Sequence, residues 1–184
     1  MPKLAVNVSL SVSIWVADEG VSSVVMVRGG IKIEVESKRV NQYQNEEERD
    51  WYDWNPEFVG DHLRSDLVNW VTALERIQMG DVDRYKRVRV DIEAMNAYFL
   101  LEPISESHLR VAFRARSREE DDPIPPTANS ARGYVVRTEQ LSNEILDCGR
   151  EFLEQTLQLG FFRTQPQLAA FSEMVDDFEA LVAS

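Results

Sequence analysis

The sequence predicts an α+β fold in which antiparallel sheet packs against amphipathic helices. Two regions alternate apolar and polar residues with a period of two, which is the pattern of strands with one buried face. Three later segments repeat apolar residues every three or four positions, which is the pattern of helices with one buried face. The chain has 184 residues, the size of one domain. We therefore expect a single domain over residues 1–184, with about six to seven strands, two helices packed on the sheet and a third helix near the C-terminus.

Residues 1–40 predict an antiparallel meander of three strands. Residues 4–16 carry seven apolar side chains at every second position, and residues 31–36 alternate Ile or Val with Lys or Glu. The more apolar residues 21–27 predict the strand between them. The glycine pair at 29–30 allows the positive φ angles of a tight hairpin, so we expect a turn there. One face of this meander is expected to be in contact with solvent.

The helical period occurs in three segments, residues 61–79, 138–159 and 165–183. Gly80 and Gly160 follow the first two segments, where a glycine ends a helix in the left-handed conformation. Thr138 is the expected N-cap of the second helix. Thr164 and Gln167 have the spacing of a capping box at the start of the third.

The second β-rich region covers residues 86–116. Strands are expected at residues 88–92, 97–101 and 109–115. Residues 134–137 predict a short last strand. Between them, residues 117–131 contain three prolines and many charges, which predicts a mobile loop without strand or helix.

The chain is acidic, with 32 Asp and Glu against 20 Lys and Arg and a formal net charge of −12. Such a charge repels the phosphate backbone of nucleic acids and attracts basic proteins. The single cysteine, Cys148, excludes an intramolecular disulfide and is compatible with a reducing cytoplasm. Polar residues interrupt the first apolar stretch at every second position, so it predicts neither a signal peptide nor a membrane span. We therefore expect a cytoplasmic protein that binds neither membranes nor nucleic acid.

The sequence lacks the motifs of several well-known enzyme classes. It has no glycine-rich phosphate loop, no G-x-S-x-G, no H-E-x-x-H and no C-x-x-C. His62 and Asp66 lie four residues apart on the first predicted helix, where they could share a metal ion but more simply form a surface ion pair. Cys148 falls on the apolar stripe of the second helix, which predicts a buried, inert thiol. We therefore predict no catalytic residue, no cofactor and no metal site.

Basic residues lie along the last long strand of the second β region and at its end. His108, Arg110, Arg114, Arg116 and Arg118 occupy alternate positions and predict a basic row on one sheet face. One interpretation is a site for an anion or RNA. The other is a ladder of cross-strand ion pairs. The carboxylates on the outer faces of the other strands favour the ladder, and they are Asp91, Glu93, Glu34 and Glu36.

The second and third predicted helices carry acidic stripes opposite their apolar ones. The acidic residues are Glu144, Asp147, Glu151 and Glu154 on the second helix and Glu173, Asp176, Asp177 and Glu179 on the third. Such stripes are usually solvated faces. They could also face a basic partner.

Residues 46–58, EEERDWYDWNPEF, combine aromatic and acidic side chains. One interpretation is that an aromatic side chain pins this segment onto the helix that follows, and the general burial of aromatic residues favours it. The other is that exposed aromatics among carboxylates form a hot spot for a basic protein. The candidate partner-binding residues are Glu46, Glu47, Glu48, Asp50, Trp51, Asp53 and Trp54.

The order of elements over residues 58–160 resembles a family of small bacterial proteins. An amphipathic helix closes as LERIQMG at residues 74–80, charged strands follow, and a Leu/Phe-rich helix comes next. This order resembles the WapI-like immunity proteins of bacterial polymorphic toxin systems. The resemblance implies a non-enzymatic inhibitor that binds one cognate toxin and has no fixed catalytic residues. The N-terminal meander and the third helix lie outside the resemblance.

Three classes of function remain open. The first is a non-enzymatic acidic module that binds a basic protein, such as a toxin. The second is a secretion-chaperone-like or adaptor protein, although such proteins usually begin with a helix and this chain begins with predicted strands. The third is a small-ligand-binding or hydrolytic protein with a cavity between sheet and helices, since carboxylates alone can catalyse hydrolysis.

Overall fold

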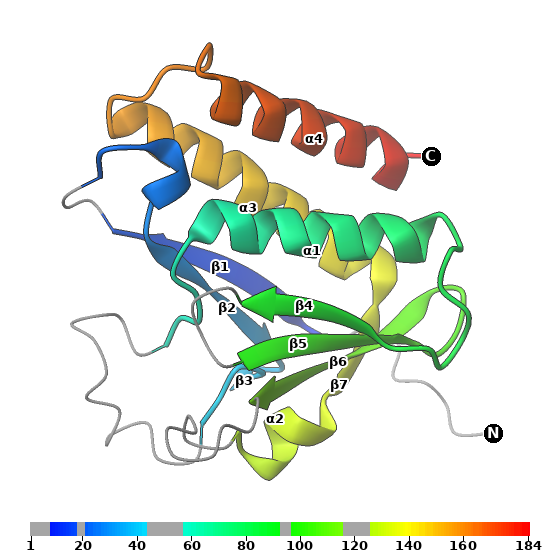
Figure 1. Ribbon diagram of the computed structural model, residues 1–184. Coiled ribbons are helices and arrows are strands. Elements are labelled where there is room, and N and C mark those ends of the chain that lie inside the picture. Colours follow the sequence, from blue (N-terminus) through cyan, green and yellow to red (C-terminus); the bar gives the residue numbers. More distant parts are fainter. Residues whose placement is uncertain (1–7, 18–20, 44–56, 93–96, 116–125) are drawn as a thin grey trace.

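The computed structural model describes residues 8–17, 21–43, 57–92, 97–115 and 126–184 (Figure 1). In chain order its elements are β1 (Leu10–Val16), the 3-10 turn η1 (Val24–Met26), β2 (Gly29–Val35), β3 (Lys38–Arg39), α1 (Leu63–Gln78), β4 (Val88–Ile92), β5 (Ala97–Pro103), β6 (His108–Ala115), α2 (Ala128–Arg132), β7 (Tyr134–Arg137), α3 (Thr138–Gln158) and α4 (Pro166–Val182). Within these ranges, no helix is long and apolar enough to cross a lipid bilayer.

Two antiparallel sheets form one side of the molecule, and α1, α3 and α4 form the other (Figure 1). The strand orders are β1-β2-β3 and β4-β5-β6-β7, so every paired strand follows its neighbour in the chain. α3 packs on β1 and α1 packs on β4, while α4 contacts both of these helices. The predicted α+β class, with antiparallel sheets packed against amphipathic helices, is therefore confirmed.

The first sheet differs from the predicted meander in its middle strand. Residues 21–27 contain the turn η1 instead of a strand, and β2 begins at Gly29. The two glycines lie inside β2 because the backbone is crowded on both sides of it. A Cβ atom on Gly29 would lie 2.2 Å from the Trp15 carbonyl oxygen, and one on Gly30 would lie 3.0 Å from Phe58 Cβ. The glycine pair therefore serves close packing and not a turn.

The hairpin turn of this sheet lies at Glu36 and Ser37, whose φ angles are 51° and 61°. It leads into the two-residue strand β3. On the same edge of β2 as β3, Ile31 is bridged to Val59 of the segment before α1, and their N–H groups and carbonyls bond reciprocally at 2.8 and 3.0 Å. This bridge fixes the start of α1 against the first sheet.

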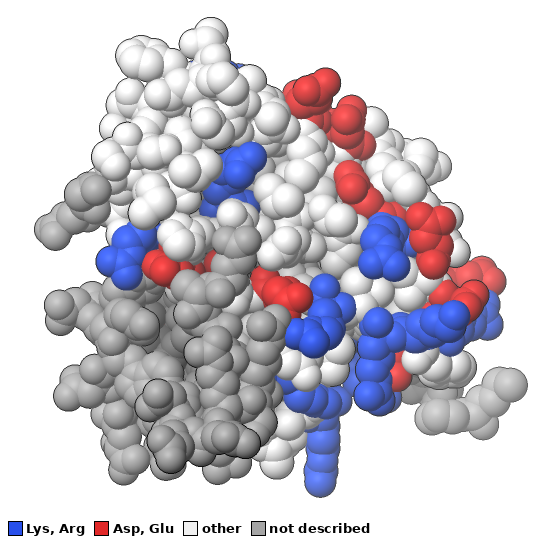
Figure 2. Space-filling model, viewed as in Figure 1, with Lys and Arg blue, Asp and Glu red and all other residues white. Residues whose placement is uncertain are grey.

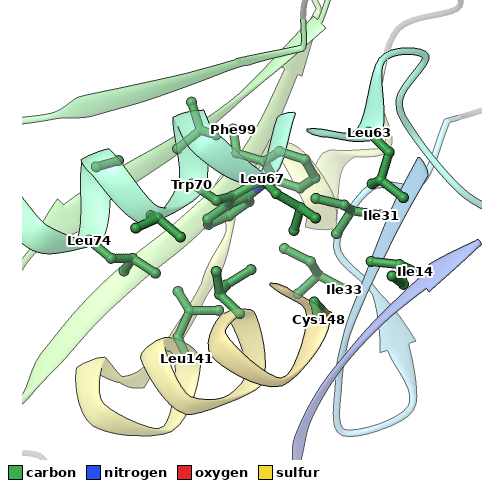
Figure 3. Close-up of a cluster of buried hydrophobic side chains, with 14 of the residues drawn as sticks. Ile14, Ile31, Ile33, Leu63, Leu67, Trp70, Leu74, Phe99, Leu141 and Cys148 are labelled. Carbon is green, nitrogen blue, oxygen red and sulfur yellow. The ribbon is translucent and has the colours of Figure 1, made fainter. Parts of the chain in front are cut away.

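The second sheet has the predicted strands, and its inward side chains form the core with α1 and α3 (Figure 3). Phe99 lies opposite Val90 on one side and Phe113 on the other, so three apolar side chains align across the sheet. Trp70 of α1 packs on Phe99 with a ring-centroid distance of 5.0 Å. The side chains of Leu67, Leu74, Leu141 and Ile33 are each fully buried around it. Apolar side chains thus fill the space between sheets and helices.

The three long helices match the predicted segments, but the N-terminal caps predicted for α3 and α4 are wrong. Arg137 is the N-cap of α3, and Thr138 is already helical and buried. Gln165 is the N-cap of α4, and Pro166 is the first residue of that helix. In neither α3 nor α4 does the N-cap side chain form a capping hydrogen bond. The expected capping box at Thr164 is therefore wrong. Proline at the first helical position explains the start of α4 without a cap, because its missing N–H needs no partner there.

Part of the predicted mobile loop is ordered helix. Residues 126–131 lie in or next to α2, so the prediction of no helix over 117–131 is wrong at this end, while 117–125 fall outside the described residues. The Thr127 hydroxyl accepts a hydrogen bond from the Ser130 N–H at 3.2 Å and caps the helix. The buried Ser130 hydroxyl donates to the Gln42 carbonyl at 2.9 Å. A contact with a segment far away in the sequence therefore supports this short helix.

Candidate functional site

The predicted partner-binding loop covers residues 46–54. All of its candidate residues lie outside the described residues, and they are Glu46, Glu47, Glu48, Asp50, Trp51, Asp53 and Trp54. The end of the same stretch is described and docks on β2. The Lys32 ammonium lies 3.3 Å from Glu57 Oε2 and 5.5 Å from the ring centroid of Phe58. Glu57 and Phe58 therefore fasten the stretch to the first sheet next to the entry of α1.

Carboxylates cover the outward sides of α3 and α4, opposite their buried apolar stripes. α3 buries Leu141, Ile145, Cys148 and Phe152, and α4 buries Leu168, Phe171, Val175 and Phe178. We give the name acidic helical face to seven exposed carboxylates of these two helices, namely Asp147, Glu151, Glu154, Glu173, Asp176, Asp177 and Glu179. Figure 2 shows acidic side chains gathered over α4 and the neighbouring end of α1.

Arg150 is the one cation within the residues of α3 and α4. Its guanidinium bonds Asp147 Oδ1 at 3.0 Å and Glu179 Oε1 at 2.5 Å, which ties the two helices together. In the part of the chain that the structure describes, the remaining carboxylates of this face have no ion-pair partner, except that Glu151 accepts a hydrogen bond from Gln155. They are Glu151, Glu154, Glu173, Asp176 and Asp177.

The negative charge of this face acts on neighbouring groups. The pKa of the Glu75 carboxyl on α1 is raised, first by burial and then by repulsion from Asp177. The pKa of the Cys148 thiol is raised to about 12, first by burial and then by Glu151, Glu144 and Asp147. Carboxylates of α3 therefore act on the thiol of their own helix, and Asp177 of α4 acts on the neighbouring helix α1. The predicted burial of this thiol is confirmed, and its raised pKa keeps it protonated at neutral pH.

The predicted surface ion pair of His62 and Asp66 is wrong, because Asp66 is fully buried. Its carboxylate lies beside Gly60, where a Cβ atom would come within 2.8 Å of Asp66 Oδ2. His62 Nδ1 instead lies 4.0 Å from Asp61 Oδ2. Among the described residues, no three His, Cys, Asp or Glu side chains lie close enough together to hold a metal ion.

The described members of the predicted basic row, His108, Arg110 and Arg114, lie on the outer face of the second sheet, away from α1, α3 and α4. Arg110 pairs with Glu102 directly opposite on β5, at 3.0 Å. The ladder interpretation was therefore right for Arg110, but its partner Glu102 was not among the predicted ones. Asp91 pairs with Arg89 on its own strand at 2.8 Å, and Glu34 and Glu36 belong to the first sheet. Three members of the prediction lie outside the described residues, namely Glu93, Arg116 and Arg118.

Sequence reasoning missed other members of this basic face. Arg87 lies 3.5 Å from Glu102, and Arg132 reaches the same place from the end of α2. The alternation of β5, carried to Glu102, would have shown that this carboxylate faces Arg110. No local pattern places Arg132 there, because α2 is held by contacts with a distant segment.

Comparison with known proteins adds no neighbour to this picture. No family model, no curated protein and no solved structure matches the chain. The resemblance to WapI-like immunity proteins therefore stays a prediction. What supports a function is the distribution of charge, with an acidic helical layer on one side and arginines on the outer sheet face.

Proposed function

We propose that the protein is a non-enzymatic binding module for a basic protein partner. The acidic helical face carries the proposal, since it presents seven exposed carboxylates with Arg150 as the one cation within its helices. Residues 138–184 hold nine Asp and Glu and two Arg, so this segment contributes −7 of the net charge of −12. Crowded like charges destabilise the compact state of a folded chain through repulsion. A ligand of opposite charge gives this arrangement a function.

Such a face raises the rate of association more than it raises affinity. Complementary charges steer a basic protein toward its site and lift association rates from about 10⁵–10⁶ to as much as 10⁸–10⁹ M⁻¹s⁻¹ at low salt. The face also lies on rigid elements, because α3 and α4 pack on α1 and on each other. The partner therefore meets a preformed surface and loses little entropy in ordering it.

An aromatic anchor is available at the end of this face. Phe162 lies in the connection between α3 and α4, and 69% of it is exposed. Interface hot spots are enriched in aromatic side chains that enter a pocket of the partner. The aromatic residues of the 46–54 loop, with their flanking carboxylates, are the second proposed contact. Both contacts would supply large apolar area to the interface.

A ligand-binding or hydrolytic function receives less support from the structure. A ligand cavity between sheet and helices would occupy the space where Trp70, Phe99 and Leu141 pack together (Figure 3). An adaptor or chaperone role uses the same acidic face as an inhibitor and differs only in what the partner is. Within the proposal we favour an immunity-type inhibitor in a reducing compartment, with a basic toxin as partner, because the order of elements over residues 58–160 resembles such proteins.

Site-specific photo-crosslinking tests the proposal in cells of the source organism. A photoreactive amino acid at position 176 should capture one protein that is absent when the same group stands at position 106 in the β5–β6 turn. Both native side chains, Asp176 and Glu106, are exposed carboxylates, so the two variants are matched in charge. The captured protein should be basic. Equal capture at the two positions, or capture of an acidic protein, would contradict the proposal.

Co-expression separates inhibition from an adaptor role. If the captured protein is a toxin, its expression alone should stop growth, and co-expression of this chain should restore it. A captured protein that is harmless alone and is exported only with this chain would instead identify an adaptor.

A further inference from the structure

A small hollow with an arginine rim lies on the outer face of the second sheet. Its floor is formed by Leu100 and Ala112, which lie opposite each other across β5 and β6. The depression exists because Ala112 has a short side chain, while the neighbouring positions on this face carry long ones. The enclosed volume is about 30 Å³, room for one or two oxygen atoms, and the hollow opens to solvent above.

Four guanidinium groups and one carboxylate surround this floor, namely those of Arg87, Arg110, Arg114, Arg132 and Glu102. Glu102 is already engaged, at 3.0 Å from Arg110 and 3.5 Å from Arg87. Arg132 has no ion-pair partner among the described residues. The described lining of the hollow thus carries a net charge of +3 in a chain whose formal net charge is −12. Figure 2 shows Lys and Arg side chains gathered below the helices, over the region of this sheet.

The rim is held in place before any ligand binds. Arg114 donates hydrogen bonds to the backbone carbonyls of Phe113 and Ala131, which orient its guanidinium. Glu102 fixes Arg110 from the opposite strand, and its side chain is only 13% exposed. Planar guanidinium groups held in this way match the oxygens of a phosphate or carboxylate, often with two parallel hydrogen bonds.

We propose that this hollow binds the phosphate group of a small phosphorylated molecule. A dianion enclosed by the rim interacts mainly with charges within the screening length of about 8 Å at physiological salt. The net charge of +3 around the hollow therefore attracts the dianion more strongly than the distant carboxylates of the helices repel it. A nucleic acid strand extends beyond this distance and is repelled by the remaining charge, which favours a small ligand over RNA.

NMR titration with inorganic phosphate tests this site. Chloride should be exchanged for phosphate at constant ionic strength, and the arginine Nε–Hε signals should be followed. We expect saturable shifts at Arg110, Arg114 and Arg132. Arg132→Gln should weaken binding about tenfold, the effect of losing one charge-assisted hydrogen bond. Arg132 is exposed, so the variant should fold normally.

Arg84→Gln is the matched control, because Arg84 is also exposed but pairs with Glu106 outside the hollow. It should leave the phosphate affinity unchanged. Shifts that do not saturate, or equal losses in both variants, would overturn the proposal. If an oligouridine binds more tightly than phosphate and loses its affinity in Arg132→Gln, the assignment to a small ligand is wrong.

Discussion

At the scale of single residues, close backbone approach explains several positions that have no local sequence signal. Gly29 and Gly30 look like a turn in the sequence, yet they are strand residues that let β1 and the Phe58–Val59 segment approach β2. The buried thiol of Cys148 was predictable, because it lies on a helical apolar stripe. The burial of Asp66 was not, because it depends on a glycine six residues earlier in the chain that leaves room for the carboxylate.

Gly29→Ala should destabilise the protein strongly. The added Cβ would lie 2.2 Å from the Trp15 carbonyl oxygen, so backbone must move, and we expect the free energy of unfolding to fall by about 3 kcal/mol. Gly80→Ala is the control, because its Cβ meets nothing within 4 Å and only the φ of 76° opposes it. That change should cost about 1 kcal/mol. Urea unfolding of both variants measures the difference, and equal losses would contradict the close approach.

The raised pKa of Cys148 predicts a pH dependence of stability. Unfolding lowers this pKa from about 12 to about 9, so the unfolded chain releases the thiol proton first as pH rises. The stabilising contribution is complete below pH 9 and is lost as pH rises from about 9 to about 12. Through this thiol, the free energy of unfolding should be about 1.4 kcal/mol lower at pH 10 than at pH 7.

Urea unfolding at pH 7 and pH 10 checks this, with Cys148→Ala as the reference. The variant removes the thiol titration and retains that of other groups, including Tyr134, whose pKa is raised by burial. If the wild type and the variant lose the same stability between the two pH values, the thiol does not titrate as proposed.

Trp54→Ala distinguishes the two interpretations of the acidic aromatic loop. A hot spot predicts weaker binding to the basic partner at an unchanged melting temperature. A helix anchor predicts a loss of stability of about 3 kcal/mol, as for a large core aromatic. We expect the first result, since Phe58 and Val59 already fasten the entry of α1. Thermal unfolding and a binding measurement on the same variant separate the two.

At the scale of elements, regular alternation and long helical stripes were enough to predict most strands and all three long helices. The prediction of a strand at residues 21–27 was wrong, because a short apolar run fits a strand and an irregular buried segment equally well. α2 was missed because its five residues depend on a hydrogen bond to Gln42, which no local pattern reveals. The helix caps were wrong because α3 follows directly on β7, so the N-cap position falls on Arg137.

Glu144 joins α3 to the edge of the first sheet. Its Oε2 accepts a hydrogen bond from the Val12 N–H at 2.9 Å, a donor on the side of β1 that faces away from β2. Glu144→Ala leaves this partly buried donor without its acceptor, so we expect a loss of about 1–2 kcal/mol in the free energy of unfolding. Glu151→Ala on the same helix should stay within about 0.5 kcal/mol, because Glu151 is exposed. Equal effects in a urea unfolding series would show that the bond to β1 does not contribute.

At the scale of the whole molecule, the distribution of charge over the surface says more about binding than the net charge does. The acidic character was evident in the sequence, and so were the two acidic helical stripes. Their union into one face was not predictable, because it depends on how α4 packs on α3 and on the bridge from Arg150 to Asp147 and Glu179. The arginine hollow needed the register of β5 and β6 and the position of α2.

The most direct test of the acidic helical face is the association rate with the crosslinked partner after charge reversal. The test variant is E173K/D176K/D177K, and the control is E36K/D83K/E106K on the β side of the molecule. Both change the formal net charge from −12 to −6, and all six native side chains are exposed. Stopped-flow mixing at about 0.15 M salt limits electrostatic effects to a range of about 8 Å. The account predicts an association rate at least about tenfold lower for the test variant, with a weaker salt dependence, and a nearly unchanged rate for the control. Equal rates for the two variants would show that only net charge matters and would contradict a binding site on α3 and α4.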